Sequence, residues 1–220
     1  MRKYPLVNNQ VYHIISRSIA GYKIFNNRAD FSRFVDMLDF YQKKLPYKYS
    51  IFTKLTLECQ NEVFKNHSNS NNPDINIVTY CIMPTHIHLT LKQIEDDGIS
   101  RYMNKILNSY SRYFNTKYKR KGPLWESRFK NILVESDEQL LHLSRYIHLN
   151  PVSANLVDKP EQWEFSSYNE YLGKTAKKIC LYNKVLEIKP AEYRKFVEDR
   201  IDYQKEISKI KNLILEDYSG

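Results

Sequence analysis

Thr79-Tyr80-Cys81-Ile82-Met83-Pro84-Thr85-His86-Ile87-His88-Leu89-Thr90-Leu91 is an apolar stretch that carries two histidines one residue apart. Its composition predicts one strand, buried on both faces except where the histidines emerge. On an extended strand, residues i and i+2 project from the same face, so His86 and His88 should present their imidazole rings side by side. Neutral imidazole is a common ligand of divalent metal ions, and a buried strand is a rigid support. The pair therefore indicates a metal site, although an isolated His-x-His is also compatible with two ordinary half-buried histidines.

The composition favours a globular protein with a polyanionic partner. The chain has 220 residues, of which 42% are hydrophobic, enough for one buried core and an appendage. Its 34 lysines and arginines outnumber 25 acidic residues, which gives a net charge of +9. Such an excess favours nucleic acid over a membrane as the partner.

The basic excess is concentrated between residues 101 and 130, where nine basic residues accompany a single acid, Glu126. Aromatic residues are set among these cations, and this mixture suits single-stranded nucleic acid, whose bases stack on rings while cations hold phosphates. About half of the rings are expected to pack in the core instead. The predicted DNA-binding residues are Arg112, Lys117, Lys119, Arg120, Lys121, Trp125 and Arg128.

Cysteine usage and the N-terminal sequence bear on the compartment. Cys59, Cys81 and Cys180 are odd in number and have no metal-ligand spacing, so reduced thiols of a cytosolic protein are expected. No apolar stretch follows Met1, and no run reaches membrane-spanning length. We expect a cytoplasmic, nucleoid-associated protein without a signal peptide or a membrane partner.

Hydrophobic periodicity predicts a mixed order of strands and helices. Strands are expected at 11–16, 49–57, 79–91 and 128–135, with a polar surface loop at 61–74. Helices are expected from Arg28, from Ser100 and over 139–150, where Pro151 should end the last one. This order predicts an α+β, ferredoxin-like split βαβ fold with a mainly antiparallel sheet, helices on one face and one additional helix.

The last of these helices contains Tyr146 and Asn150, which are four residues apart and therefore share a face. Mg²⁺ or Mn²⁺ bound by two histidines needs oxygen ligands, and the Asn150 carbonyl is one candidate. The Tyr146 phenol would then face a phosphate on the same metal. The alternatives are a packed tyrosine and a helix-terminal asparagine. His148 lies roughly 200° from Tyr146 around the helix, so it is not expected to be its base.

Five sequence blocks, in order and spacing, resemble the REP-associated tyrosine transposases, which belong to the IS200-like, single-tyrosine group of HUH endonucleases. The resemblance extends over about residues 5–173, and the blocks are MPTHIHL (83–89), SYSRYFN (109–115), GPLWESRF (122–129), YIHLNPV (146–152) and WEFSSY (163–168). It implies a divalent metal at His86 and His88, Tyr146 as the nucleophile, and single-stranded DNA with a foldback hairpin as the substrate. Asn150 stands where relatives carry a polar third ligand, often Gln.

Some points depart from that pattern or stay open. Thr85 replaces a residue that is often Asn or Asp, and little effect is expected because its side chain should point to the opposite strand face. His13, a lone strand histidine, is left outside the predicted site. We expect a catalytic domain over 1–173 and a C-terminal helical extension over 174–220. A monomer is expected, with a helix-exchanging homodimer as the alternative.

Two competing functions can be named. The first is a transposase-derived protein that binds structured nucleic acid without cutting it, although such a protein would not need His86, His88 and Tyr146 together. The second is a nucleotide hydrolase of the histidine-triad type, which fits less well because Thr90 occupies the position of the third histidine.

Overall fold

A four-stranded sheet forms the centre of the computed structural model, which describes residues 5–67 and 73–203. Its strands run in the order β2-β3-β1-β4, and every neighbouring pair is antiparallel. The strands are β1 (Val11–Arg17), β2 (Ile75–Ile82), β3 (His86–Gln93) and β4 (Lys130–Val134). This order of elements and strands confirms the predicted ferredoxin-like α+β fold.

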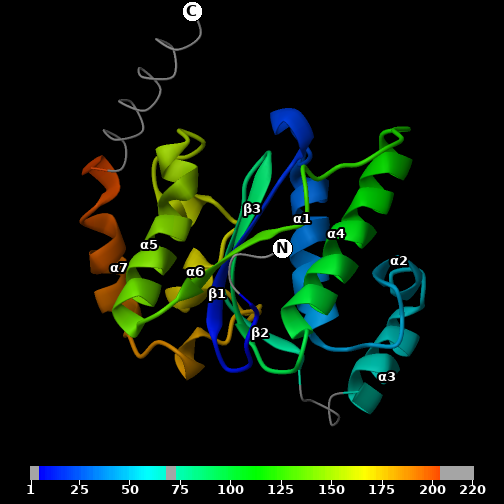
Figure 1. Cartoon of the computed structure of the whole chain (residues 1–220), viewed down its shortest axis with the longest axis horizontal. Coiled ribbons are helices and arrows are strands. Elements are labelled where there is room, and N and C mark those ends of the chain that lie inside the picture. Colours follow the sequence, from blue (N-terminus) through cyan, green and yellow to red (C-terminus); the bar gives the residue numbers. More distant parts are fainter. Residues whose placement is uncertain (1–4, 68–72, 204–220) are drawn as a thin grey trace, which may run out of the picture.

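Helices cover both faces of the sheet. The α-helices are α1 (Arg28–Gln42), α2 (Tyr49–Phe52), α3 (Leu57–His67), α4 (Gly98–Lys117), α5 (Asp137–Ser153), α6 (Tyr168–Tyr171) and α7 (Pro190–Glu198). Short 3-10 helices are η1 (Ile19–Gly21), η2 (Pro160–Gln162) and η3 (Tyr182–Lys184). α1 and α4 share one face, and α5 packs on the opposite face together with α6 and α7 (Figure 1). The expectation of helices on one face therefore holds for α1 and α4 but not for α5.

The strand pleat divides the core between these two faces. Tyr12 and Ile14 of β1 join the large cluster formed with α1 and α4, whereas the preceding Val11 packs with Leu140 of α5. Successive side chains of a strand point to opposite faces, so one strand serves both layers. The histidines at alternating positions of β3 therefore lie on the α5 face.

The predicted strand at 79–91 is a hairpin of two strands, which corrects that expectation. β2 ends at Ile82 and β3 begins at His86, and the Met83 amide donates to the His86 carbonyl (2.9 Å). Pro84 lies in the turn because proline cannot donate a ladder hydrogen bond. The histidines thus begin a strand beside a tight turn.

The prediction of a strand at 49–57 is also wrong, as is that of a loop starting at residue 61. The segment forms α2 and α3, and its aromatic residues pack helix against helix: the Phe52 ring lies 5.0 Å from Phe40 of α1. Packing of this kind overrides the β-propensity of aromatic and β-branched residues. The predicted loop residues 68–72 lie outside the described part of the chain.

Pro151 does not end α5, contrary to expectation, and the helix continues to Ser153. Proline in the last turn removes one backbone hydrogen bond, and the neighbouring Leu149 and Val152 are fully buried. The helix begins at Asp137, two residues before the predicted start, because the Ser136 hydroxyl caps it by accepting a hydrogen bond from the Gln139 amide (3.1 Å).

Residues after α5 cover the free edge of β2. The amide of Ile82 donates to Phe165 (3.0 Å), that of Ser167 to Tyr80 (2.9 Å), and that of Leu181 to Ile77 (2.8 Å). The block WEFSSY thus protects an edge strand. Beyond residue 173, α7 packs on α5, while the part of the predicted C-terminal extension from 204 to 220 lies outside the described residues.

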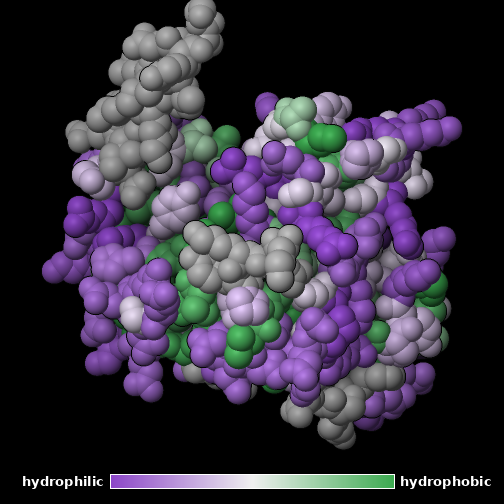
Figure 2. All heavy atoms as spheres, viewed as in Figure 1, coloured by the Kyte–Doolittle hydropathy of each residue, from purple (hydrophilic) through white to green (hydrophobic). Residues whose placement is uncertain are grey.

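The surface is mainly hydrophilic in the view of Figure 2, with hydrophobic residues visible between α5 and α4. None of the helices in the described ranges is long and apolar enough to cross a membrane.

Candidate active site

Two imidazole rings meet at the start of β3, on the face that α5 covers. The ring centroids of His86 and His88 lie 5.0 Å apart, and the ring planes are nearly perpendicular. His88 is 4% exposed and His86 is half-buried. The antiparallel register with β1 sets this position, because Ile15 pairs with His88 and Arg17 with His86.

Each ring is held through its Nδ1 atom. His13 of β1 places its Nε2 atom 3.0 Å from His88 Nδ1, and the two rings stack. The Thr85 hydroxyl lies 3.0 Å from His86 Nδ1. Two expectations are corrected here: His13 belongs to the site, and the Thr85 side chain reaches His86 because Thr85 stands in the turn rather than in a strand.

Burial keeps these imidazoles neutral. Burial, with a smaller contribution from the Arg17 charge, lowers the pKa of His86 to about 4. Burial holds the pKa of His88 well below its usual value, helped by the neighbouring His86 and His13. Since only the neutral ring binds a metal, both side chains are ready to act as ligands at neutral pH.

Tyr146 of α5 lies beside this histidine pair. Its ring centroid is 5.9 Å from that of His88, in an edge-to-face arrangement, and its side chain is 44% exposed. The neighbouring Ile147 is fully buried against Cys81 and Met83 of the sheet, which fixes the rotation of the helix. The phenol is thus open to solvent next to two buried imidazoles in the same chain.

Asn150 lies one helical turn beyond Tyr146. Its side-chain Nδ2 atom donates to the Tyr146 carbonyl (2.9 Å), which leaves Oδ1 as the atom available to a further partner. The side chain is half-buried.

The donor atoms fit a hard divalent ion that retains oxygen ligands. Among the described residues, no group of three or more His, Cys, Asp or Glu side chains could hold a metal. Within the same residues, His86 and His88 form side-chain hydrogen bonds only through Nδ1, which leaves both Nε2 atoms available to a metal. Hydrogen bonds at the second ring nitrogen are characteristic of metal-binding histidines. Mg²⁺ or Mn²⁺ would complete its shell with oxygen atoms from Asn150, substrate or water.

Arg17 was not singled out by the sequence pattern. It is exposed at the end of β1, directly opposite His86, and its charge contributes to the lowered pKa values of both site histidines. Alternation along β1 puts His13 and Arg17 on one face, but only the register with β3 brings them to the histidine pair.

His148 lies away from this site, as predicted. It is fully buried, with Nδ1 2.6 Å from the Tyr193 hydroxyl and Nε2 2.7 Å from the Ser167 hydroxyl. Burial lowers its pKa to about 3. This histidine therefore links α5 to the C-terminal part of the chain.

The predicted DNA-binding residues are spread over several surfaces. Lys117 forms an ion pair with buried Asp30 (2.5 Å), and the Trp125 indole donates to the Leu107 carbonyl (3.2 Å). Arg112 lies on the outer side of α4. Lys119, Lys121 and Arg128 are exposed, and Arg120 is half-buried with its guanidinium over Tyr22.

Comparisons with known proteins show the family and the fold of the chain. A protein of Haemophilus influenzae described as a REP-associated tyrosine transposase is 31% identical over 103 residues, covering 42% of this chain and 58% of that protein. A solved REP-associated tyrosine transposase bound to a REP hairpin shares 14% identity at a TM-score of 0.55, covering 86% of this chain and 95% of that one. At this identity the second likeness concerns the fold alone. The family model of IS200-like transposases matches residues 6–150, so the chain belongs to that family.

Proposed function

We propose that the protein is a metal-dependent DNA transesterase that nicks and rejoins single-stranded DNA near hairpins through a 5′-phosphotyrosine intermediate. The observation that carries the proposal is the approach of Tyr146 to His88 within one chain, with ring centroids 5.9 Å apart. Membership of the transposase family supports the reaction class. The hairpin bound to the solved relative supports the kind of substrate.

In this mechanism the Tyr146 oxygen attacks the scissile phosphorus in line. The new bond joins the phenol oxygen to phosphorus, the phenol loses its proton, and the departing 3′ oxygen takes up a proton as the P–O bond breaks. No water is consumed, so a second 3′-OH can reverse the reaction and restore the phenol. This balance explains how one residue can both cut and rejoin a strand.

The surrounding residues would position and polarise the phosphate. His86 and His88, with Asn150 as a third candidate, would hold Mg²⁺ or Mn²⁺. The ion would supply positive charge to the non-bridging oxygens and polarise the scissile bond. The Arg17 guanidinium, opposite His86, would add a second positive charge at the same phosphate.

A labelled hairpin oligonucleotide with a single-stranded flank, incubated with Mg²⁺ or Mn²⁺, tests the proposal. Wild-type protein should form a covalent adduct, whereas Tyr146→Phe should form none and still bind DNA within a few fold. His86→Ala should stop cleavage. Tyr203→Phe, which changes another exposed tyrosine, is the matched control and should behave as wild type.

An adduct that survives in Tyr146→Phe would mean that another residue is the nucleophile. Binding of the hairpin without any metal-dependent cleavage by the wild type would favour the alternative, a transposase-derived nucleic-acid-binding protein.

A further inference from the structure

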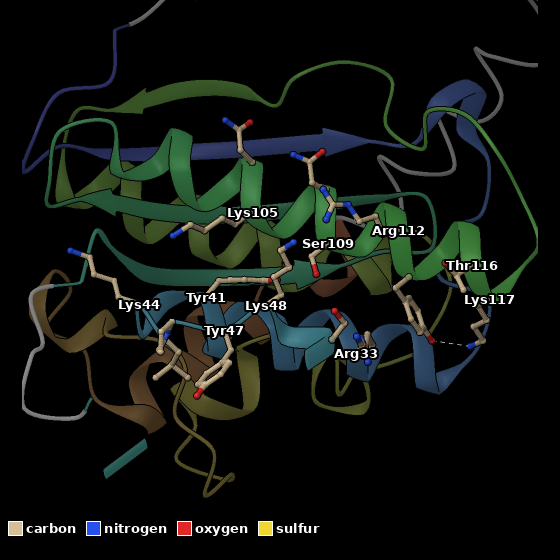
Figure 3. Close-up of a pocket in the computed structure, with 16 residues that line it drawn as sticks. Arg33, Tyr41, Lys44, Tyr47, Lys48, Lys105, Ser109, Arg112, Thr116 and Lys117 are labelled. Carbon is tan, nitrogen blue, oxygen red and sulfur yellow. Dashed lines mark hydrogen bonds between the residues drawn. The ribbon is translucent and has the colours of Figure 1, made fainter. Parts of the chain in front are cut away.

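A basic groove lies on the side of the molecule opposite to the histidine and tyrosine site. It is a cavity of about 880 Å³ between α1, the segment that follows it and the outer side of α4. Figure 3 shows Lys105, Ser109 and Arg112 along α4, with Arg33 on α1 facing them. Because α1 and α4 pack on one face of the sheet and α5 on the other, the groove is separated from Tyr146 by the sheet (Figure 1).

The groove carries positive charge that the protein does not neutralise. Its lining contains six cationic side chains and no acidic one. Two of them are paired, Lys44 with Asp74 (2.8 Å) and Lys117 with Asp30 (2.5 Å). The other four form no ion pair with any residue of the described ranges, and they are Arg33, Lys48, Lys105 and Arg112.

Arg33 is fixed in place although no carboxylate holds it. Its guanidinium carbon lies 4.6 Å from the centroid of the Tyr49 ring and 4.8 Å from that of Tyr113. Its Nε atom is buried without a hydrogen-bond partner among the described residues. A cation that is held between two rings and has no carboxylate partner keeps a charge that an anion from outside the protein can neutralise.

The groove offers mainly cationic and polar donors, and among its three lining tyrosines only Tyr47 is exposed, at 38%. Tyr113 already has Arg33 and Lys117 over its ring, and the Tyr41 hydroxyl accepts from the Tyr49 amide (3.3 Å). The remaining lining on α4 consists of cations with amide and hydroxyl groups between them. Lys105 and Arg112 are two helical turns apart, about 10.5 Å along the axis. This pattern suits successive phosphates better than a run of unpaired bases, because successive bases need several free rings to stack on and Tyr47 is a single one.

We infer that this groove is a second DNA-binding surface, which contacts the phosphate backbone of a paired stem while the cleavage site acts on the unpaired strand. The inference rests on the proposed function for the identity of the polyanion. The groove is a separate surface from the candidate active site. None of the residues that line it touches the histidine and tyrosine site.

The test compares two DNA ligands in a chelating buffer, so that no cleavage occurs. One is a hairpin with an unpaired flank, and the other is the unpaired flank alone. In Lys105→Gln/Arg112→Gln, affinity for the hairpin should fall on the order of tenfold or more at about 0.1 M salt. The slope of log Kd against log salt should fall by about 2, roughly one for each lost phosphate contact.

The unpaired flank alone should lose much less affinity. The matched control is Lys189→Gln/Lys195→Gln, which removes the same charge from exposed positions at α7. For either ligand, this control should change the slope of log Kd against log salt by less than the groove variant does. Circular dichroism should show that both variants keep the wild-type fold.

An unchanged hairpin affinity in the groove variant, or equal losses for both ligands and in the control, would overturn the inference. The covalent adduct on the unpaired strand, measured separately with metal, keeps the two proposals distinguishable. If the wild type forms the adduct but the groove variant binds the hairpin with unchanged affinity, the proposed function stands and the groove inference fails. If the groove variant loses hairpin affinity as expected but the wild type forms no adduct, the cleavage proposal fails and the groove inference stands.

Discussion

At the scale of single residues, the candidate site is organised around the unequal roles of the two nitrogens of each histidine. Nδ1 of His86 is hydrogen-bonded with the Thr85 hydroxyl and Nδ1 of His88 with His13 Nε2, which leaves the Nε2 atom of each ring for a ligand. Rigid support of this kind distinguishes a built ligand pair from two histidines that happen to be neighbours.

His13 is a positioning residue in this account. His13→Ala should leave His88 free to rotate and should weaken Mn²⁺ binding by about 10- to 100-fold, the usual cost of losing such a partner. Isothermal titration with Mn²⁺ measures this without reference to activity. His142→Ala, which removes an exposed histidine of α5, is the control and should bind Mn²⁺ as the wild type does. Equal affinity in both variants would contradict a positioning role for His13.

Arg17 should act on the reaction rather than on stability. Its side chain is exposed, so Arg17→Gln should leave the free energy of unfolding almost unchanged. The rate of adduct formation should fall by roughly tenfold or more, because a positive charge near the phosphate stabilises charge that develops there. Single-turnover kinetics with saturating DNA measure the rate, with Lys178→Gln as a surface control. A wild-type rate in Arg17→Gln would remove Arg17 from the mechanism.

At the scale of elements, α1 and α4 are joined by a buried carboxylate. Asp30 is fully buried and accepts hydrogen bonds from Lys117 (2.5 Å), Tyr118 (2.6 Å) and Tyr113 (2.9 Å). Burial alone would raise the pKa of Asp30, but the hydrogen bonds from Lys117 and Tyr118 outweigh it and hold the pKa below its usual value. This cluster fixes the beginning of α1 against the end of α4.

Asp30→Ala should therefore lower the free energy of unfolding by about 3 kcal/mol, because three side-chain donors and the Asn26 amide lose a buried acceptor. Urea denaturation measures this loss. Asp39→Ala breaks a more exposed pair with Lys43 and should cost less than about 1 kcal/mol.

The pH dependence follows from the sign of the shift. Because the pKa of Asp30 is lower in the folded protein than in the unfolded chain, where it is about 3.9, its carboxylate adds to the free energy of unfolding at a pH above that value. This contribution is lost as the pH falls further. Equal losses in the two variants at neutral pH would contradict the role of Asp30.

Hydrophobic periodicity predicts the helices whose buried face is continuous in the sequence. It fails at the segments whose secondary structure is set by tertiary contacts. The apolar stripes of α1 and α4 were sufficient to predict those helices, since residues three and four apart share a buried face. The stretch at 79–91 predicts one strand because both sides of Pro84 are equally apolar, and only the proline indicates the hairpin. The segment at 49–57 is aromatic in either conformation, and only its packing on Phe40 selects the helix.

The same distinction applies to the site. His86 and His88 are neighbours on one strand, so their pairing is visible in the sequence. The approach of Tyr146 involves a separate helix, and its role was inferred from the family resemblance. His13 and Arg17 reach the site through the register of β1 against β3, which no local pattern encodes.

At the scale of the whole molecule, each chain contains a complete set of candidate site residues. Tyr146 lies beside His88 of its own chain, so no partner subunit is needed to supply the phenol. We expect a monomer that cuts in cis.

Complementation tests this expectation. A mixture of Tyr146→Phe and His88→Ala should form no adduct, because each variant lacks one half of its own site. Light scattering after gel filtration should give the mass of one chain. Adduct formation by the mixture would instead indicate that α5 is exchanged between subunits.

The central claim is that Tyr146 is the nucleophile at the histidine pair. The most direct measurement is mass spectrometry of the peptides obtained after the wild-type protein has reacted with a suicide oligonucleotide and the attached DNA has been trimmed by nuclease. The account predicts a 5′-phosphonucleotide on Tyr146, formed only when divalent metal is present and lost in His86→Ala. A modified residue at any other position, or cleaved DNA with no modified peptide, would contradict it.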